Sequence, residues 1–542
     1  MSRGAPLRQR KGENLKQLIK LPAVAALAAL LAACDGDDGD NGINGTSGSA
    51  GVDGLNSLVA TRQLQLGDAV CPGGGIALDS GLDTNRDGTL DAGEVTSTEY
   101  IDCERAPQLR AVHASPDAPA VNVWVNGAAA LTDVPYGAGS GFLDVTTATQ
   151  VQIEANIPGG NAIVIDESLT LDFNSENTVL AVGTVATLQA LVVSNEAGEL
   201  FLPGNVRAQV VHAAPAAPAV DVYVTAPGAD LATSNPINAA PLGFQDSTGR
   251  VDVPGGDYQI RVTAAGDPTT VVYDSGTVAL AAGADLLITA VANTGPGAAA
   301  VELVVLDGES ASTIRDTGTP AAVVAVHASP DAPSVDILAD SAATTEDDAI
   351  ALARDVAFPN VCAIDAVPVG SYTLNITAAG DPMTVALSFP FEAAAATTST
   401  AIVAGMLTST PAIAPIALGG DLRSVATESK IRVTHASGAT GAVDLYLVAD
   451  DTDITSAEVM PSFGAVPFMA DTGILSVSPG TYDVYVTPQG TTDTIAIEVQ
   501  DLVLSAGGVL DVIARDPAAD GSEGTLPQLI VIDQTNVADC TL

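Results

Sequence analysis

The sequence is poor in positive charge and in aromatic side chains. It holds 19 Lys and Arg residues against 65 Asp and Glu residues, and its formal net charge is −46. A surface this negative repels nucleic acid and acidic lipid, so no nucleic-acid partner is expected. Aromatic residues make up 4% of the chain and hydrophobic residues 47%. Any core must therefore be built mainly of Val, Ile, Leu and Ala.

Motifs of well-known catalytic chemistry are missing as well. The chain has no GxSxG elbow, no HExxH pair and no P-loop. Their absence argues against an enzyme without excluding one. Histidine, the commonest general acid and base, occurs only four times, and all four copies lie in one repeated pattern.

The repeated pattern is the His-Ala-Ser-Pro-Asp-Ala-Pro stretch that begins at His113. In every copy a Val stands eight residues after the histidine and is followed by Asn or Asp; the four histidines are His113, His212, His327 and His435. The copies are 99, 115 and 108 residues apart, which is the length of a domain rather than of a solenoid repeat. The sequence thus predicts four tandem domains, at residues 106–204, 205–319, 320–425 and 426–542.

The residues around the pattern alternate between apolar and polar. In the fourth copy, Ile431, Val433 and His435 alternate with Arg432 and Thr434. A period of two predicts a β-strand with one buried face. In the first three copies the prolines of the motif, such as Pro116 and Pro119, forbid a helix after the corresponding strand. We therefore expect an all-β protein whose four domains are two-sheet β-sandwiches of immunoglobulin-like size.

The H-A-S-P-D-A-P-x-V-D-V pattern resembles the hallmark of a family of bacterial domains of unknown function, which often occur in tandem on secreted and surface proteins. The resemblance covers residues from about 107 to 542. It implies β-sandwich domains and a surface setting, and it supplies no catalytic residues to transfer.

The motif histidine and aspartate, such as His113 with Asp117, could form an acid–base pair or a metal site. The second and fourth copies have Ala216 and Ala439 in place of the aspartate. Because His435 shares its strand face with apolar residues, we interpret the histidines as core residues that hydrogen-bond the proline-rich crossing.

Three aromatic residues, Trp124, Tyr223 and Tyr446, fall on one face of the strand that follows the motif. They form either a binding surface or a cover, which lies over the sheet or against the neighbouring domain. We favour the cover, because single aromatic residues of this kind are common on ordinary sheets.

The first 33 residues have the pattern of an export signal. A basic segment precedes the apolar run 21–33, which is too short to span a bilayer, and small residues precede Cys34. This arrangement resembles bacterial lipoproteins, in which the cysteine is lipidated and anchors a soluble protein to a membrane. The resemblance implies lipidation of Cys34 and attachment to the outer membrane or cell surface. Asp35 leaves the periplasmic face of the inner membrane as an alternative.

Glycine occupies every third position from Gly36 to Gly54, as in collagen. None of these triplets contains proline, on which the triple helix depends. We expect residues 34–54 to be a flexible acidic tether rather than part of a trimer.

Residues 83–94 match the twelve-residue EF-hand loop, in which oxygen ligands surround Ca2+ and a central glycine permits the turn. The expected ligands are Asp83, Asn85, Asp87, the Thr89 carbonyl group, Asp91 and Glu94. The flanks depart from the EF-hand family, because glycines at 73–75 and 81 stand where a helix should enter and no second loop follows. We therefore expect a weak, structural Ca2+ site on a small extracellular module.

Four cysteines remain once Cys34 is set aside, and an exported protein meets oxidising conditions in which they can pair. Of the three possible pairings we favour Cys71 with Cys103, which bracket the acidic loop, and Cys362 with Cys540. The order of tether, cysteine and acidic loop also resembles an uncharacterised module of bacterial surface lipoproteins, at residues 55–105.

Together these features predict a non-enzymatic surface lipoprotein with a structural calcium site. Its four sandwiches would serve adhesion or contact with an extracellular protein or glycan. The alternative is a carbohydrate-active or other hydrolytic enzyme whose site lies between domains. Repetition favours the binding role, because similar copies can share one binding task, whereas catalysis usually needs one copy that has gained polar residues.

Overall fold

The computed structural model describes residues 54–197, 202–341 and 349–540. The prediction of an all-β protein is confirmed, since these residues form 35 strands and no α-helix. Two short 3-10 helices, η1 (Val185–Thr187) and η2 (Leu231–Thr233), complete the regular structure. No helix in the described part of the chain is long and apolar enough to span a bilayer.

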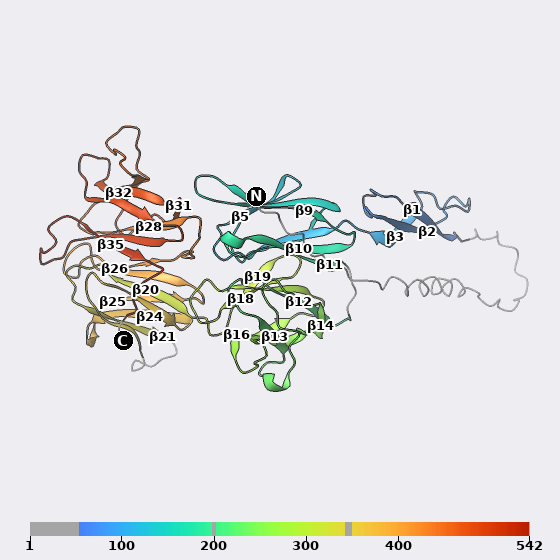
Figure 1. The fold of residues 1–542 in the computed structure, drawn as a ribbon, viewed down its shortest axis with the longest axis horizontal. Coiled ribbons are helices and arrows are strands. Elements are labelled where there is room, and N and C mark those ends of the chain that lie inside the picture. The colour runs from blue at the N-terminus through green and yellow to red at the C-terminus, as the bar shows by residue number, and fades with distance from the viewer. Residues whose placement is uncertain (1–53, 198–201, 342–348, 541–542) are drawn as a thin grey trace, which may run out of the picture. The chain divides into compact units, whose positions relative to one another are not determined.

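A small module at the N-terminal side of the described chain holds a three-stranded sheet in the order β1-β2-β3 (Figure 1). Its strands are β1 (Ser57–Leu64), β2 (Gly74–Leu82) and β3 (Val95–Glu104). The buried apolar residues are few, namely Leu64, Cys71 and Ala77. The disulfide between Cys71 and Cys103 confirms the predicted bond and reinforces a module that has little core of its own.

Eight further sheets follow, two for each copy of the histidine motif. The first domain comprises β4 (Gln108–His113), β5 (Val121–Val125), β6 (Ala128–Val134), β7 (Leu143–Asp144), β8 (Ala148–Ala155), β9 (Ala162–Thr170), β10 (Ser175–Val182) and β11 (Gln189–Glu196). The second comprises β12 (Asn205–His212), β13 (Val220–Thr225), β14 (Val251–Pro254), β15 (Gly256–Ala264), β16 (Val271–Leu280), β17 (Asp285–Ala292), β18 (Val301–Leu306) and β19 (Ala311–Ile314).

The remaining two domains are built in the same way. The third comprises β20 (Ala321–His327), β21 (Val335–Ser341), β22 (Ile350–Val356), β23 (Val361–Val367), β24 (Gly370–Ala378), β25 (Asp381–Ala393), β26 (Thr398–Ala404) and β27 (Ala414–Leu418). The fourth comprises β28 (Ser429–Ala436), β29 (Val443–Ala449), β30 (Phe463–Val466), β31 (Leu475–Val477), β32 (Gly480–Pro488), β33 (Ile497–Leu504), β34 (Val509–Arg515) and β35 (Gln528–Asp533). The disulfide between Cys362 and Cys540, which confirms the other predicted bond, ties the C-terminal end to β23.

The two sheets of a domain meet at the histidine motif. The sheets that contain the motif strands β4, β12, β20 and β28 have the orders β11-β10-β4-β7, β14-β12-β17-β18-β19, β23-β20-β26-β27 and β31-β28-β34-β35. The other sheets have the orders β6-β5-β8-β9, β13-β15-β16, β22-β21-β24-β25 and β30-β29-β32-β33. Each motif strand pairs in parallel with a later strand of its own sheet, and the chain then crosses to the other sheet. The predicted β-sandwich is confirmed, and the motif forms its corner.

The expectation of one buried face is wrong for the four motif strands. Every residue of β20 and β28 is buried, and in β4 and β12 only the first residue is half-buried. One face of β28, with Ile431 and Val433, lies in the core of the fourth domain. The other face lies against the third domain, and even the polar residue Arg432 on this face is buried.

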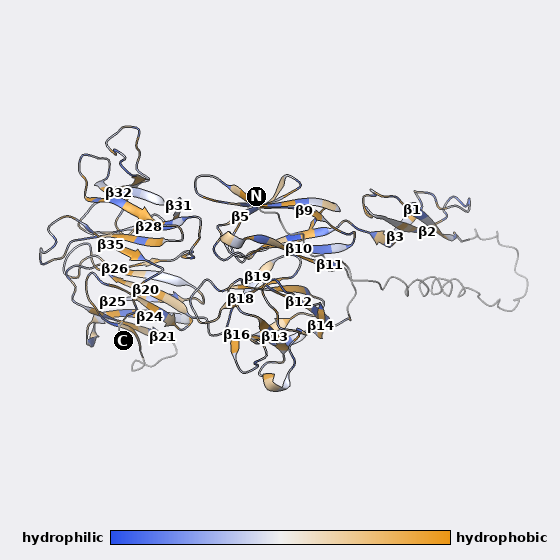
Figure 2. Ribbon diagram, viewed as in Figure 1, coloured by the Kyte–Doolittle hydropathy of each residue, from blue (hydrophilic) through white to orange (hydrophobic). Residues whose placement is uncertain are grey.

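The four domains are joined in two pairs through their motif-bearing sheets. One shared core contains Val112, Ala114, Leu180, Val182 and Val193 of the first domain with Val211, Ala213, Leu287, Val291, Val304 and Leu306 of the second. The other contains Val324, Val326, Ala328, Ile402, Ala404, Ile416 and Leu418 of the third domain with Ala436, Ile513, Ile530 and Ile532 of the fourth. Figure 2 shows hydrophobic colour along these strands.

The alanine after each motif histidine faces the paired domain. Ala114, Ala213, Ala328 and Ala436 are at most 1% exposed, and each belongs to one of the two shared cores. A side chain of this size lets the two sheets approach closely. The histidine thus serves its own sandwich, and the next residue serves the contact with another.

The three aromatic residues of the second sheet do not form an exposed surface. Tyr223 and Tyr446 are 4% and 3% exposed, and Trp124 is half-buried. Tyr446 packs with Ile454 and Tyr485. Such residues cover a sheet and leave little aromatic surface free for a ligand.

A contact between the first domain and the segment before β28 links the two pairs. Arg423 Nη1 donates to the carbonyl oxygens of Pro116 at 2.7 Å and Ala118 at 2.8 Å. The Ala426 amide donates to the Asp117 carbonyl at 2.8 Å. Carbonyl groups of the first motif thus hold the chain that connects the third and fourth domains.

We predict that Ala114→Leu destabilises the first and second domains together. The larger side chain must enter a shared core that is already filled, at a cost of about 1 to 3 kcal/mol. Thermal unfolding of the full chain should show one transition moved to lower temperature, assigned to both domains by limited proteolysis. Ala128→Leu, at an exposed position of the same domain, is the control. Loss of structure in the first domain alone would show that the core is not shared.

Candidate metal loop and the repeated histidine corner

The four motif histidines make the same hydrogen bond. Each is at most 3% exposed, and each Nε2 lies beside the backbone carbonyl six residues further on: His113 and Pro119 at 2.8 Å, His212 and Pro218 at 3.1 Å, His327 and Pro333 at 3.0 Å, His435 and Gly441 at 3.0 Å. Because a carbonyl oxygen only accepts, Nε2 carries the proton. The imidazole therefore fastens the crossing between the two sheets.

The environment keeps the imidazoles of His113 and His327 neutral. Burial lowers the pKa of His113 from an ordinary 6.5 to about 4, although the bond to Pro119 opposes the shift. Burial also lowers the pKa of His327. In both copies Nδ1 faces the backbone N–H of the residue two positions on, Ser115 or Ser329, at 3.4 Å. A proton on Nδ1 would point at this backbone N–H, and the two donors would repel each other.

An aromatic ring that the motif does not contain supports the imidazole in three domains. Tyr136, Phe358 and Phe468 stand edge-on to His113, His327 and His435 with ring centroids 6.0, 6.0 and 6.3 Å apart. Edge-to-face packing of this kind is favourable. The differing distances of these rings along the sequence concealed them from the repeat pattern.

The histidine and aspartate of the motif do not come together as a pair. The Asp117 carboxylate accepts from the Val185 amide at 2.8 Å, and the Asp331 carboxylate accepts from the Leu407 and Thr408 amides at 2.7 and 2.9 Å. Each aspartate therefore holds the loop after the parallel partner strand. It contributes to the fold and does not orient the imidazole.

In the fourth domain the same two loops are also joined by a carboxylate, but the carboxylate lies in the loop after the parallel strand and not in the motif. Ala439 stands at the motif position, and Asp516 after β34 accepts from the Ser437 hydroxyl and from the Gly438 amide at 2.8 Å. The carboxylate has moved to the other loop while the connection between the loops is retained.

The Asn or Asp after the repeated valine also has a structural role. The sequence pattern contained this residue but did not indicate what it does. Asp336 and Asp444 accept from the Gly380 and Gly490 amides at 3.0 and 2.7 Å. These glycines have φ values of 77°, a region that other residues enter only with strain. Asp221 accepts similarly from Gly266, at 2.7 Å. The carboxylate thus fixes the next hairpin.

The acidic loop between β2 and β3 is closed by its first and last residues. Asp83 and Glu94 are 1% and 8% exposed. Glu94 Oε1 accepts from the Thr84 amide at 2.8 Å and the Asn85 amide at 3.0 Å, and Oε2 accepts from the Asp91 amide at 3.1 Å. Hydrogen bonds from Thr84, Asn85 and Asp91 lower the pKa of Glu94, so the carboxylate stays charged.

The middle of the loop brings three of the expected ligands to one point. Asn85 Nδ2 donates to Asp87 Oδ2 at 3.1 Å and to Asp91 Oδ2 at 2.9 Å. The amide group therefore stands where a cation would meet both carboxylates. In the described part of the chain no group of three or more acidic, histidine or cysteine side chains is arranged to hold a metal as it stands. The donor set suits Ca2+, but the Asn85 amide must turn before it can serve.

Cys34 and the tether up to residue 53 lie outside the described residues. The predictions of lipidation and of a flexible tether therefore remain predictions.

A cavity of about 1340 Å³ lies among loops of the second, third and fourth domains. Its charged lining residues are Glu302, Arg315, Asp365, Glu392, Asp421 and Arg423. Burial raises the pKa of Glu302, and Arg315, whose Nε lies 3.6 Å from Glu302 Oε2, opposes the shift. These residues are far apart in the sequence, and no motif indicated that they would meet.

Comparison with protein families gives two matches. The model of a domain of unknown function (DUF4397) matches residues 107–223 and 321–446, and that of another domain of unknown function (DUF7151) matches residues 56–103. The resemblance predicted for residues from about 107 to 542 is confirmed for two tandem regions, and neither match includes residues 224–320 or 447–542. Each DUF4397 match runs through one domain and into the second strand of the next, so each includes two histidine corners. No curated protein matches the chain.

We predict that His113 makes stability depend on pH. The unfolded chain takes up a proton near pH 6.5, whereas the folded imidazole resists protonation down to about pH 4. Stability should therefore be full above pH 6.5 and fall by about 3 kcal/mol as the pH drops to 4, at roughly 1.4 kcal/mol per unit.

Acid also protonates carboxylates, so the measurement is the difference between wild type and His113→Gln in chemical unfolding from pH 7.5 to 4. The glutamine amide can donate to Pro119 but does not titrate. A difference that stays constant over this range would contradict the account.

Proposed function

We propose that the protein is a non-enzymatic, exported lipoprotein whose four sandwiches form a stiff acidic array for adhesion or contact with an extracellular protein or glycan. One observation carries the proposal: all four histidines make the same backbone hydrogen bond. A histidine that makes the same bond in all four domains has a structural role. The outer surface of each domain is then the part that remains for binding.

The contacts between domains support a stiff array rather than four independent beads. Two shared apolar cores join the domains in pairs, and Arg423 bonds the first motif to the chain before the fourth domain. Interfaces that are large and hydrophobic restrict the motion of domains. A stiff array holds several weak binding surfaces at fixed spacing, which raises the affinity for a repetitive partner.

The calcium site is part of this proposal. Asp83 and Glu94 already draw the loop ends together, and Asp87 and Asp91 converge on Asn85. Glu94 Oε1 already accepts from the Thr84 amide and hydroxyl and from the Asn85 amide, so Ca2+ would replace some of these hydrogen bonds. When bound, Ca2+ would neutralise the repulsion among four carboxylates and stiffen the module that precedes the array. With lipidation at Cys34, this module would connect the membrane to the sandwiches.

The cavity beside Glu302 favours one alternative, a hydrolase that acts on carbohydrate or a related substrate. A carboxyl group with a raised pKa can serve as a general acid, and Asp365 and Glu392 also line the cavity. No aromatic residue is among those that line it, although sugar rings commonly stack on such residues. The binding role therefore remains the first proposal.

We predict that calcium protects the module from proteolysis. In millimolar Ca2+, cleavage between Cys71 and Cys103 should slow, because calcium binds only the closed loop, and chelator should reverse the effect. Glu94→Gln should lose most of the protection, whereas Glu99→Gln, at an exposed position outside the loop, should keep it. Magnesium should protect poorly. Calorimetry that finds no calcium binding at millimolar concentration would end this part of the proposal.

We predict that the purified full chain binds at least one glycan or matrix protein in an array and turns over no glycoside or ester substrate. The physical reason is that the repeated polar residues are committed to the fold. Glu302→Gln is the decisive variant, since it should leave binding unchanged. Turnover that this variant abolishes would replace the binding role with the hydrolase.

A further inference from the structure

One buried arginine occurs at the same place in two domains and has different partners. Arg110 and Arg432 each stand three residues before the motif histidine, on β4 and β28. Both point away from their own core and toward the paired domain. Across the parallel ladder, Arg432 is in register with Asp511, whereas Arg110 is in register with Thr178.

Arg432 is fully supplied with acceptors. Its Nε and Nη2 donate to the two Asp511 oxygens at 2.8 and 2.6 Å, and Nη1 donates to the Gly419 carbonyl at 2.8 Å. Both side chains are 2% exposed. A buried ion pair is tolerated when geometry and further hydrogen bonds are this complete. This site is closed and leaves no room for a ligand on the guanidinium.

Arg110 lacks the equivalent carboxylate. Its Nε donates to Thr178 Oγ1 at 2.9 Å, and its guanidinium lies 4.4 Å from the centre of the Phe142 ring. Among the residues that the structure describes, its Nη1 has no hydrogen-bond partner, and the whole residue is only 7% exposed. A hydroxyl group offers one oxygen where Asp511 offers two. A buried charged donor without an acceptor is costly.

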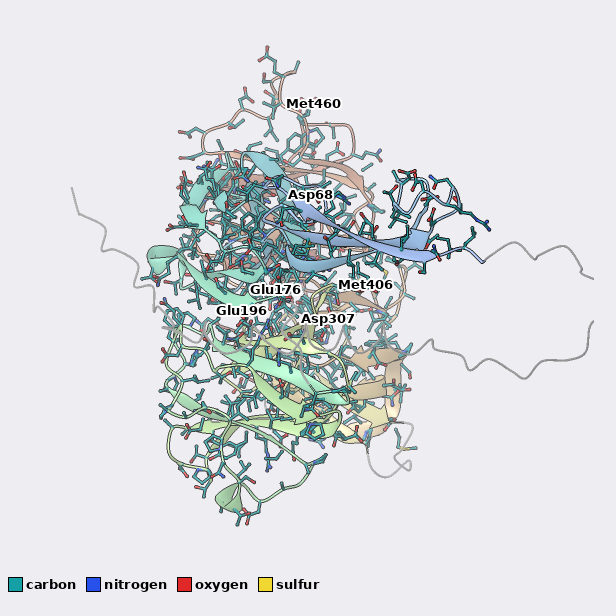
Figure 3. The ribbon with its side chains drawn as sticks, turned by 90° about the vertical axis from the view of Figure 1, so that its right-hand side faces the viewer. Asp68, Glu176, Glu196, Asp307, Met406 and Met460 are labelled. Carbon is teal, nitrogen blue, oxygen red and sulfur yellow. A yellow bond between two sulfur atoms is a disulfide. The ribbon has the colours of Figure 1, made fainter. Side chains whose placement is uncertain are left out.

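A cavity of about 330 Å³ between the first and second domains lies beside this arginine. Glu176 and Asp307, which Figure 3 labels, line it together with Asp285 and Glu309. Asp307 and Glu309 are exposed, so the cavity opens to solvent on their side. Arg250 neutralises part of this charge, since its Nη2 lies 2.8 Å from Glu176 Oε2 and 3.6 Å from Asp285 Oδ2.

The charges that line the cavity therefore favour a small ligand that carries one negative and one positive group. Arg110 needs an oxyanion in the place that Asp511 fills in the fourth domain. The surrounding carboxylates exceed the arginines by two, with four acids against Arg110 and Arg250, and they disfavour a simple anion. A positive group on the same ligand would be attracted to these carboxylates and would offset their repulsion of the ligand anion.

We propose that this cavity binds a small zwitterion that carries a carboxylate and an ammonium group, as an α-amino acid does. The ligand carboxylate accepts from Arg110 Nη1, and the ammonium group lies toward Glu176 and Asp307. Asn195 and Gln209, joined by a 2.8 Å hydrogen bond, offer further polar atoms at the wall of the cavity.

The test is isothermal titration of the purified full chain with glycine and L-alanine, with acetate and methylammonium as single-charge probes at equal ionic strength. The zwitterions should bind at one site at least about tenfold more tightly than either single-charge probe. Thr178→Asp supplies the carboxylate from within the protein and should abolish this binding. Arg432→Gln, at the closed site, should leave it unchanged.

Arg110→Gln provides a second route should Thr178→Asp fail to fold, which the melting temperature will reveal. A folded Arg110→Gln protein should also lose the binding. The proposal is overturned if neither amino acid binds, if acetate binds as tightly as glycine, or if a folded Thr178→Asp or Arg110→Gln protein still binds glycine.

Discussion

The rest of the structure depends on the burial of each motif strand on both faces. A strand in this position has no access to water, so its polar side chains must find partners inside the protein. The histidine finds the carbonyl of the crossing, and Arg432 finds Asp511. The alanine beside the histidine is small because another sheet lies against it. The repeated motif is thus the set of residues that can occupy a strand between two cores.

This constraint explains why the motif recurs without a catalytic site. A residue committed to a corner cannot also be free for substrate, and the same corner occurs in every domain. Functional variation must then arise where the pairs differ. The replacement of Asp511 by Thr178 at equivalent positions is such a difference, as is the cavity that forms where loops of three domains meet.

Local patterns could be predicted from the sequence, whereas contacts between domains could not. The alternation around Ile431 and Val433 indicated a strand, and the spacing from Asp83 to Glu94 indicated a calcium loop of EF-hand type, but not the hydrogen bonds to Glu94 that close it. The alternation placed Arg432 on the exposed face of its strand, and nothing in the local sequence indicated its neighbour in the third domain, Thr400, which lies more than thirty residues before it. Asp516 escaped notice for a similar reason, since it takes the role of a motif aspartate from a distant strand.

The most direct test of the account is native-state hydrogen exchange on the full chain, measured by mass spectrometry. If the first and second domains share one core, the amides of β4 and β12 should open together, with the same dependence on denaturant. The amides of β20 and β28 should form a second group of this kind. Exchange of β4 through an opening that leaves β12 protected would contradict the claim that the motif strands join the domains in pairs.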